Sequence, residues 1–283
     1  AIGLYADRTR ALPVNDPHDR ELTISCGAAL YTLCLSARVR ALAPRVTTLP
    51  GDDPDLLALV ELLGGGSADE RDQALLAACP VRRTVRAPFS GRPVPADLVR
   101  RLGEAVAAEG AWLEIVGDDP RRTALAELVA EGDAMQFADP SWRRELASWM
   151  HPRRRGEGLV VPIAALPIAR LVVSALDLGT RTGAKDAALL EGSPVVAVLG
   201  TDGDATADWL DAGRALQSAL LTAAAEGVHA SYLNQPCQVG ELRPRLADLL
   251  ERPGLPQLVL RFGFPAQEGR PAPRRPVSAV VEE

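Results

Sequence analysis

The strongest constraint on the fold is an unbroken apolar run from Pro194 to Leu199, which precedes a long apolar helix predicted over residues 209–225. A strand without polar alternation is typical of one that is covered on both faces of its sheet. Gly227 stops the helix, and a second clear strand is predicted over residues 257–264. These elements predict layers of helices that cover a buried sheet.

The rest of the chain alternates helices with a few short apolar strands. Apolar residues that recur at intervals of three and four predict the helices, and Gly or Pro marks several of their ends. The expected helices span 19–43, 54–63 and 68–78, with another opened by Val94-Pro95, and the expected strands span 2–6 and 112–116. This order of elements predicts an α+β fold.

Residues from about 132 to 192 show no sustained hydrophobic period and contain several Gly, Pro and Arg residues. Long irregular segments inside compact domains usually form lids or binding loops. We therefore expect a lid-like insertion in this part of the chain.

Composition favours a compact protein with a large core, because 47% of the 283 residues are apolar and 24% are charged. We find no uninterrupted apolar stretch of membrane-spanning length, and no basic and apolar leader follows Ala1. The sequence is therefore interpreted as cytoplasmic, without a membrane partner. A net charge of -6 and an aromatic content of 4% argue against an extended nucleic-acid-binding face.

Metal binding and nucleophilic catalysis are not indicated. The four cysteines are spaced neither for a zinc site nor for a redox pair, so we interpret them as buried apolar side chains. His18, His151 and His229 are isolated from any Ser or Cys nucleophile signature and are expected in loops or at the surface. No catalytic residue can be assigned from these patterns.

An arginine cluster stands out between two amphipathic segments. Residues 81–93 contain four arginines and the Thr84 hydroxyl in a chain that is acidic overall. Arginine presents planar, permanently charged donors that fit a phosphate bidentately, so the cluster predicts a phosphate site. Alternatively, Arg82 and Arg83 interact with carbonyls at the end of the preceding helix, and Arg86 is a solvated charge.

Two long helices share a short pattern. Residues 26–30, Cys-Gly-Ala-Ala-Leu, parallel residues 212–216, Ala-Gly-Arg-Ala-Leu, at a constant offset of 186 residues. Small residues at matching places suggest two helices that pack closely, as the central helices of a two-fold dimer do. One chain would then imitate a dimer; chance similarity between alanine-rich helices is the alternative.

The stretch Arg82-Arg83-Thr84-Val85-Arg86, with Pro88-Phe89 and then Val94-Pro95, resembles the opening of a nitroreductase. In that family an Arg-Arg-Ser/Thr-x-Arg stretch binds the phosphate and ribityl chain of FMN. The resemblance therefore implies that Arg82, Arg83, Thr84 and Arg86 bind FMN.

The later part of the chain is similar to the remainder of such a module. The resemblance covers the loop 231–236, the strand that ends in Phe262-Gly263-Phe264-Pro265, and the tail around residue 275. It implies that Ser231, Tyr232 and Leu233 also lie at the flavin, with a backbone N–H of this loop facing the reactive flavin nitrogen. Arg275 matches the second phosphate-binding position of the family, with Arg274 beside it.

The first part resembles the tandem, Acg-like nitroreductases, on Asp7-Arg8, Asp16, residues 20–22 and residues 26–28. The resemblance implies two pseudo-symmetric modules in one chain, 1–79 and 80–283, with one FMN site and a lid over residues 132–192. The Pro-Ser-x-x-Asn-x-Gln-Pro-Trp stretch of the family would lie before Ala1. Whether such a chain pairs further with a second copy stays open.

The activity implied by the resemblance is a ping-pong transfer. NAD(P)H reduces the flavin and leaves, and a nitroaromatic or quinone acceptor then takes the electrons. The flavin carries the hard chemical step, which agrees with the absence of a catalytic triad in the sequence. The alternative is a protein that stores or sequesters FMN under the lid without turnover.

Overall fold

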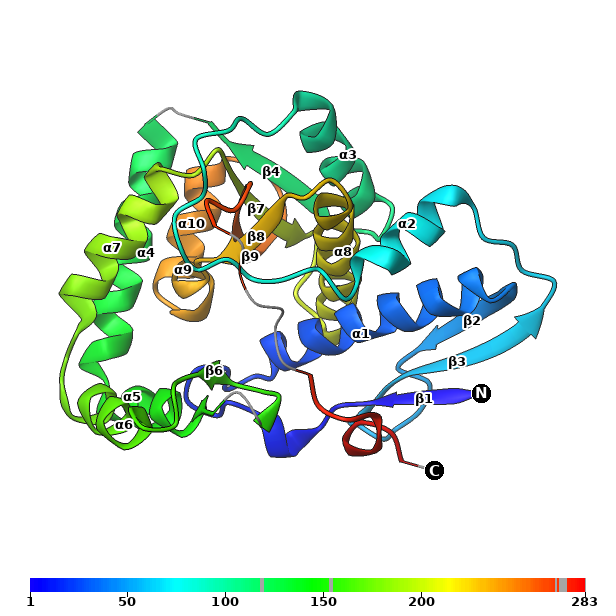
Figure 1. Ribbon diagram of the computed structural model, residues 1–283, viewed down its shortest axis with the longest axis horizontal. Helices are drawn as coiled ribbons and strands as arrows, with labels where there is room; N and C mark the ends of the chain where they lie inside the picture. The colour runs from blue at the N-terminus through cyan, green and yellow to red at the C-terminus, as the bar shows by residue number, and fades with distance from the viewer. Residues whose placement is uncertain (118–119, 153–154, 268, 270–273, 283) are drawn as a thin grey trace.

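The computed structural model describes residues 1–117, 120–152, 155–267, 269 and 274–282 (Figure 1). The helices are α1 (Arg20–Val39), α2 (Glu70–Ala78), α3 (Ala96–Ala107), α4 (Pro120–Ala138), α5 (Pro140–Ser148), α6 (Leu166–Ala175), α7 (Gly179–Glu191), α8 (Thr206–Ala225), α9 (Gln235–Gln238) and α10 (Leu242–Leu250), with short 3₁₀ turns at Arg8–Arg10 and Val277–Ala279. The strands are β1 (Ile2–Tyr5), β2 (Leu42–Thr48), β3 (Leu56–Gly64), β4 (Trp112–Val116), β5 (Met150–His151), β6 (Leu159–Val160), β7 (Val195–Thr201), β8 (His229–Tyr232) and β9 (Leu255–Gly263).

The main sheet has the strand order β4-β7-β9-β8, with antiparallel neighbours throughout. Every residue of β7 is buried, which confirms the doubly covered strand predicted from its unbroken apolar run. Ala197 and Leu199 of β7 pack with α3 and α8 on one face, and Val196 and Val198 pack with α4 and α10 on the other. The predicted α+β layering is therefore confirmed.

A second, three-stranded sheet has the order β1-β3-β2 and is antiparallel (Figure 1). Its inner face is covered by α1, where Leu30 and Cys34 pack against Ala58 and Val60 of β3. This small layer joins the main body of the molecule through α1.

The two long helices α1 and α8 cross at glycines, as the small-residue pattern predicted. A Cβ built on Gly27 would lie 3.0 Å from the Cα of Gly213, and one built on Gly213 would lie 2.8 Å from the Cα of Gly27. Each would also overlap a backbone carbonyl of the other helix, that of Leu210 or Ile24. The predicted close packing of these helices is confirmed.

One predicted helix and one predicted helix end are wrong. Of residues 54–63, expected to be helical, residues 56–63 belong to β3, which pairs on both edges with β1 and β2. The predicted helix 19–43 overruns its end, because α1 stops at Val39 and Leu42 begins β2. A short apolar run fits either structure, and the long-range pairing of β3 with its neighbours decides between them.

The expectation of an irregular segment over 132–192 is also wrong in part. The segment contains the end of α4 and all of α5, α6 and α7. Gly179 and Gly183 bring α7 so close to α4 that an added Cβ would lie 2.8 Å from the Cα of Ala134 or 2.9 Å from that of Ala130. Helices that meet through small residues need no strong apolar stripe, which is why the period is hard to see in the sequence.

The apolar length of α1 was underestimated from the sequence. Among the described residues, α1 is the one helix long and apolar enough to cross a membrane by these two criteria. Its apolar residues are used inside the protein, since Ile24 packs in the main core with α8 and Leu30 packs against β3.

Candidate functional site

The predicted phosphate-binding segment runs beside the edge strand β8. The backbone N–H of Val85 donates to Ala230 O at 2.9 Å, and Thr84 forms an isolated parallel bridge with the same residue. Further along, the N–H of Ser90 donates to Phe264 O at 2.8 Å. The sequence thus places its arginine cluster on a segment that is attached to the main sheet at two points.

Within the part of the chain that the structure describes, no carboxylate forms an ion pair within 4.0 Å with Arg82, Arg83 or Arg86. The side chain of Arg83 donates to Gly269 O at 3.2 Å, away from the end of α2. This arrangement suits an anionic ligand better than it suits helix capping.

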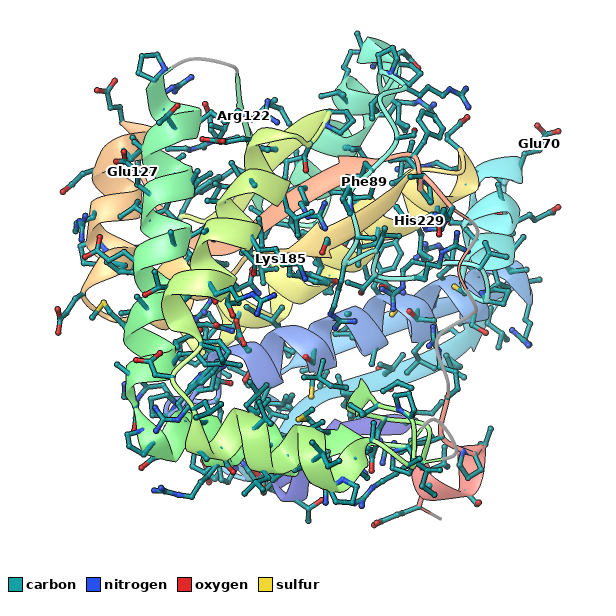
Figure 2. All side chains as sticks on the ribbon, turned by 60° about the vertical axis from the view of Figure 1, so that its left-hand side comes forward. Glu70, Phe89, Arg122, Glu127, Lys185 and His229 are labelled. Atoms are coloured by element: carbon teal, nitrogen blue, oxygen red, sulfur yellow. The ribbon has the colours of Figure 1, made fainter. Side chains whose placement is uncertain are left out.

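His229 lies beside these arginines, which sequence reasoning missed. It is 7% exposed, at the start of β8, and its Nδ1 has no hydrogen-bond partner among the described residues. Burial, with Arg83 and Arg82 adding to it, lowers the pKa of the imidazole, so the ring is neutral at neutral pH. Phe89 and His229 lie at the same end of β9, where both meet Gly263 (Figure 2). His229 stands alone in the sequence, without a neighbouring motif, so nothing in the sequence indicated that it would lie beside the arginines.

The three predicted loop residues have different environments. Ser231 is buried within β8, opposite Arg261 of β9. Burial raises the pKa of the Tyr232 phenol, and Arg82 and Arg86 oppose that shift, so the phenol lies within the field of the cluster. Leu233 packs in the core under α4, and its backbone N–H donates to Val259 O at 3.0 Å.

Arg274 and Arg275, the two arginines of the tail, lie in different surroundings. Burial, followed by repulsion from Arg82, lowers the pKa of Arg274, which places this guanidinium near the cluster. Arg275 instead lies 3.9 Å from the Glu157 carboxylate and donates to Ala279 O at 3.1 Å. The structure therefore brings Arg274 toward Arg82 and holds Arg275 on the segment between α5 and α6.

Glu157 gathers three arginines from separate parts of the chain. It accepts from Arg155 at 2.8 Å and from Arg10, and it pairs with Arg275. The adjacent Gly156 approaches the backbone of the tail, where an added Cβ would lie 2.8 Å from Arg274 O. The insertion is thus attached to both ends of the chain.

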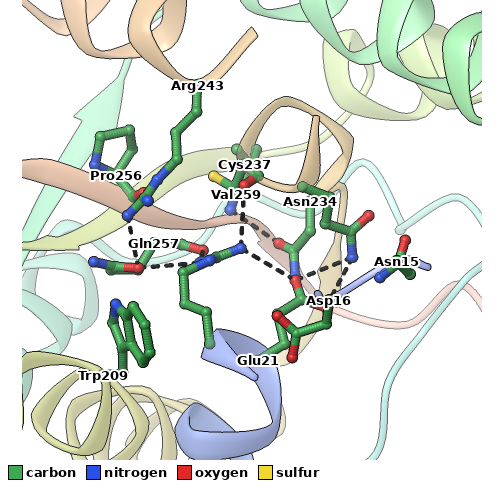
Figure 3. Close-up of polar contacts among 12 residues, drawn as sticks. Asn15, Asp16, Glu21, Trp209, Asn234, Cys237, Arg243, Pro256, Gln257 and Val259 are labelled. Carbon is green, nitrogen blue, oxygen red and sulfur yellow. Dashed lines mark hydrogen bonds and ion pairs between the residues drawn. The ribbon is translucent and has the colours of Figure 1, made fainter. Parts of the chain in front are cut away.

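A buried polar network supports the loop after β8 (Figure 3). Asn234 accepts from the backbone N–H of Val259 at 3.1 Å and donates to Glu21 at 3.3 Å, and Gln238 donates to both Glu21 oxygens at 3.0 and 2.9 Å. Burial raises the pKa of Glu21, and Arg20 is the main opposing charge. Because Glu21 belongs to α1, the first helix holds the loop in place from the side of the small sheet.

Described residues away from the arginine cluster also line cavities. One of about 360 Å³ is lined by Arg71, Ala74, Leu75, Arg101, Glu104, Thr222, Ala225 and Glu226. Another, of about 570 Å³, is lined by His151, Pro152, Arg155, Ile163, Leu166 and Arg170. His151, expected in a loop or at the surface, is 5% exposed and lies 3.1 Å from an Arg170 nitrogen. Neither cavity is lined by a predicted FMN-binding residue.

Comparison with known proteins identifies the class. No family model matches the chain. The Mycobacterium tuberculosis protein named "Putative NAD(P)H nitroreductase Rv3131" is 30% identical over 100% of this chain and 83% of its own length. The M. tuberculosis protein named "Putative NAD(P)H nitroreductase acg" is 27% identical over 99% of this chain and 86% of its own length.

A solved structure supports the same fold. The FMN-dependent nitroreductase NfnB from Mycobacterium smegmatis, solved in complex with NADPH, matches with a TM-score of 0.51 and 20% identity, over 76% of this chain and 99% of that chain. The fold is thus that of a nitroreductase. The chain belongs to the NAD(P)H nitroreductase family, in its Acg-like branch, as the sequence resemblance implied.

Proposed function

We propose that this protein binds FMN and transfers electrons from NAD(P)H to a small nitroaromatic or quinone acceptor by a ping-pong mechanism. Membership of the nitroreductase family supports the reaction class. The observation that carries the cofactor proposal is the approach of Arg82 and Arg83 to the buried His229 beside β8, with Arg274 near Arg82. Neither Arg82 nor Arg83 takes part in an ion pair within 4.0 Å among the described residues.

The residues present fit the phosphate of FMN. Three guanidinium groups offer forked donors, and the unpartnered Nδ1 of His229 is a buried polar atom that a ligand would satisfy. Thr84 offers a hydroxyl within the same segment, and Arg86 adds charge near Tyr232. We assign Arg82, Arg83, Thr84, Arg86 and Arg274 to the phosphate and ribityl side of the site.

The loop Ser231–Leu233 is assigned to the flavin side on its proximity to the cluster. Since Ser231 is buried in β8 and the N–H of Leu233 is engaged with Val259 O, Tyr232 is the residue of this stretch that we place nearest the cluster. When bound, FMN supplies the hydride and electron transfer chemistry, and the protein binds, orients and shields it. Arg275 becomes a phosphate ligand only if it leaves Glu157.

The cofactor assignment is tested by equilibrium titration of FMN into the purified protein. The triple variant R82A/R83A/R86A is expected to lose FMN retention, because each charge-assisted contact is worth about 1.5 to 3 kcal/mol. R100A is the matched control, since Arg100 is an exposed arginine of α3 that pairs locally with Asp97 and Glu104. Unchanged retention in the triple variant would refute the assignment.

Turnover is tested by mixing the FMN-loaded protein with NADH or NADPH under anaerobic conditions and following the visible flavin absorbance. Bleaching on the time scale of turnover supports the oxidoreductase. Persistent colour that only dithionite removes supports the alternative, sequestration of FMN. One observation favours sequestration: Gly156 and Glu157 of the insertion contact the tail that carries Arg274 and Arg275. This contact holds the insertion near the proposed phosphate site, where it would cover a bound FMN.

We also infer that the chain combines two modules, residues 1–79 and 80–283, with residues 132–192 as the lid. The reciprocal crossing of α1 and α8 supports this division, because Ile24 contacts Gly213 as Leu210 contacts Gly27, at the same offset of 186 residues. The stoichiometry of FMN binding tests it: one FMN per chain of 30.0 kDa is expected, whether or not two copies pair, and two FMN per chain would contradict a single site shared by two modules.

A further inference from the structure

Arg261 is a buried cation in the middle of the main sheet. It is 1% exposed and lies on β9, between Leu260 and Phe262 of the core. Its guanidinium carbon is 4.6 Å from the centre of the Phe89 ring. An apolar side chain would fill this position at lower cost, because burying a charge away from a close partner is expensive.

The buried guanidinium of Arg261 is only partly hydrogen-bonded. Its Nε and Nη1 atoms have no hydrogen-bond partner in the described chain, and none of the ion pairs found there within 4.0 Å includes Arg261. Burial lowers the pKa of Arg261, and Asp186 of α7 opposes the shift from a longer distance. Because this burial is costly, the hydrogen bonds that the guanidinium does make point to a specific task.

The contacts of the remaining nitrogen indicate that task. Nη2 donates to Val85 O at 2.9 Å and to Ala87 O at 3.1 Å, so one nitrogen holds the carbonyls on both sides of Arg86. The same segment is attached to Ala230 at its beginning and to Phe264 at its end. Arg261 supplies the attachment in the middle, where the chain leaves the sheet edge.

We propose that Arg261 is a positioning residue for the cofactor phosphate. By fixing the carbonyls of Val85 and Ala87, it orients the backbone from which Arg82, Arg83 and Arg86 project. It acts through that segment and does not itself contact the phosphate. This inference rests on the proposed FMN site.

The test compares FMN with riboflavin, which lacks the phosphate. Both ligands are titrated into the wild type, R261K and R261Q by fluorescence quenching. R261Q is expected to weaken FMN binding about tenfold or more, as for the loss of a charged hydrogen-bond donor, with little change for riboflavin. R261K, which keeps the charge but reaches one carbonyl at a time, is expected to lose less.

R243Q is the matched control. Arg243 also donates to a backbone carbonyl of β9, that of Pro256 at 2.9 Å, but at the other end of the strand. It is expected to lower the melting temperature without altering the ratio of FMN to riboflavin affinity. If R261Q does not fold, R261K decides the question by the same ratio.

The outcomes are distinguishable. Selective loss of FMN affinity in the Arg261 variants supports the positioning role. An equal loss for both ligands, or an unchanged ratio, overturns it, because a merely structural role weakens both. Failure of the wild type to prefer FMN over riboflavin refutes the phosphate site itself.

Discussion

Gly27 of α1 and Gly213 of α8 meet face to face, each where a Cβ would overlap a backbone carbonyl of the other helix. The contact is reciprocal, since Leu210 O faces Gly27 and Ile24 O faces Gly213. A hydrogen bond from Gln217 to Thr32 at 3.0 Å extends the same interface. This crossing joins the layer of the small sheet to the main sheet.

The substitution G213A tests the crossing. Because the added methyl group cannot avoid Ile24 O without separating the helices, the free energy of unfolding is expected to fall by at least about 1 to 3 kcal/mol, the usual cost of overpacking. Urea denaturation measures it. G103A is the control, since Gly103 of α3 has open space and gains helix propensity of up to about 1 kcal/mol. Equal effects of the two substitutions would contradict the close approach.

The buried carboxyl of Asp133 and its half-buried neighbour Asp186 make stability depend on pH. Gln235 donates from one nitrogen to Asp133 at 3.1 Å and to Asp186 at 3.2 Å, and the second oxygen of Asp133 has no partner among the described residues. Burial, with repulsion from Asp186, raises the pKa of Asp133 to about 7. Lys185 and Arg261 moderate the corresponding rise in Asp186. One proton is therefore retained by the fold near neutral pH.

Because the folded pKa is raised, the stabilisation is present in acid and is lost as the pH rises from about 4 toward 7. The slope is at most about 1.4 kcal/mol per pH unit for one proton. Denaturation at several pH values is expected to show a smaller slope for D133N than for the wild type. D248N, at an exposed position of α10, is the control. If the unfolding free energy changed equally with pH in D133N and the wild type, Asp133 would not hold a proton in the folded state.

E157Q tests the contact between the insertion and the tail. The Glu157 carboxylate holds Arg275 and also repels an approaching phosphate, so its removal is expected to tighten FMN binding by about twofold to fivefold, the modest effect of an ion pair as long as 3.9 Å. FMN titration measures the change. E131Q removes an exposed carboxylate that pairs with Arg245 at 2.7 Å and is expected to have no effect. Weaker binding in E157Q would show that the contact supports the site.

R20M tests how α1 holds the loop after β8. Arg20 is 7% exposed and donates to Gln257 O at 2.6 Å and to Cys237 O at 3.2 Å, beside Glu21. Removing it leaves the Glu21 carboxylate without its main opposing charge and two backbone carbonyls without their donor, so a loss of about 3 to 5 kcal/mol is expected in thermal or urea unfolding. R40M, at the exposed end of the same helix, is expected to cost little. Similar losses in both would argue against the buried network.

Much of the main sheet was predictable because the hydrophobic pattern of each strand or helix reflects which of its faces are buried. An unbroken apolar strand such as β7 requires two covered faces, and the helices α3 and α8 show the spacing of a helix with one buried side. The arginines of the phosphate segment were visible for a similar reason, since clustered charge in an acidic chain is a local property. Residues 54–63 were mistaken for a helix because their apolar run fits both structures.

The sequence by itself determined the layers of the main sheet, the glycine-mediated crossing and the arginine segment. Each of these depends on the hydrophobic period, the residue sizes or the charges of a short segment. Only the tertiary structure decided that residues 56–64 are a strand, that His229 joins the arginines, that Arg275 pairs with Glu157, and that Arg261 is buried beneath Val85 and Ala87. These relationships connect residues far apart in the chain, and strand pairing and charge contacts of that kind exist only after the backbone has folded.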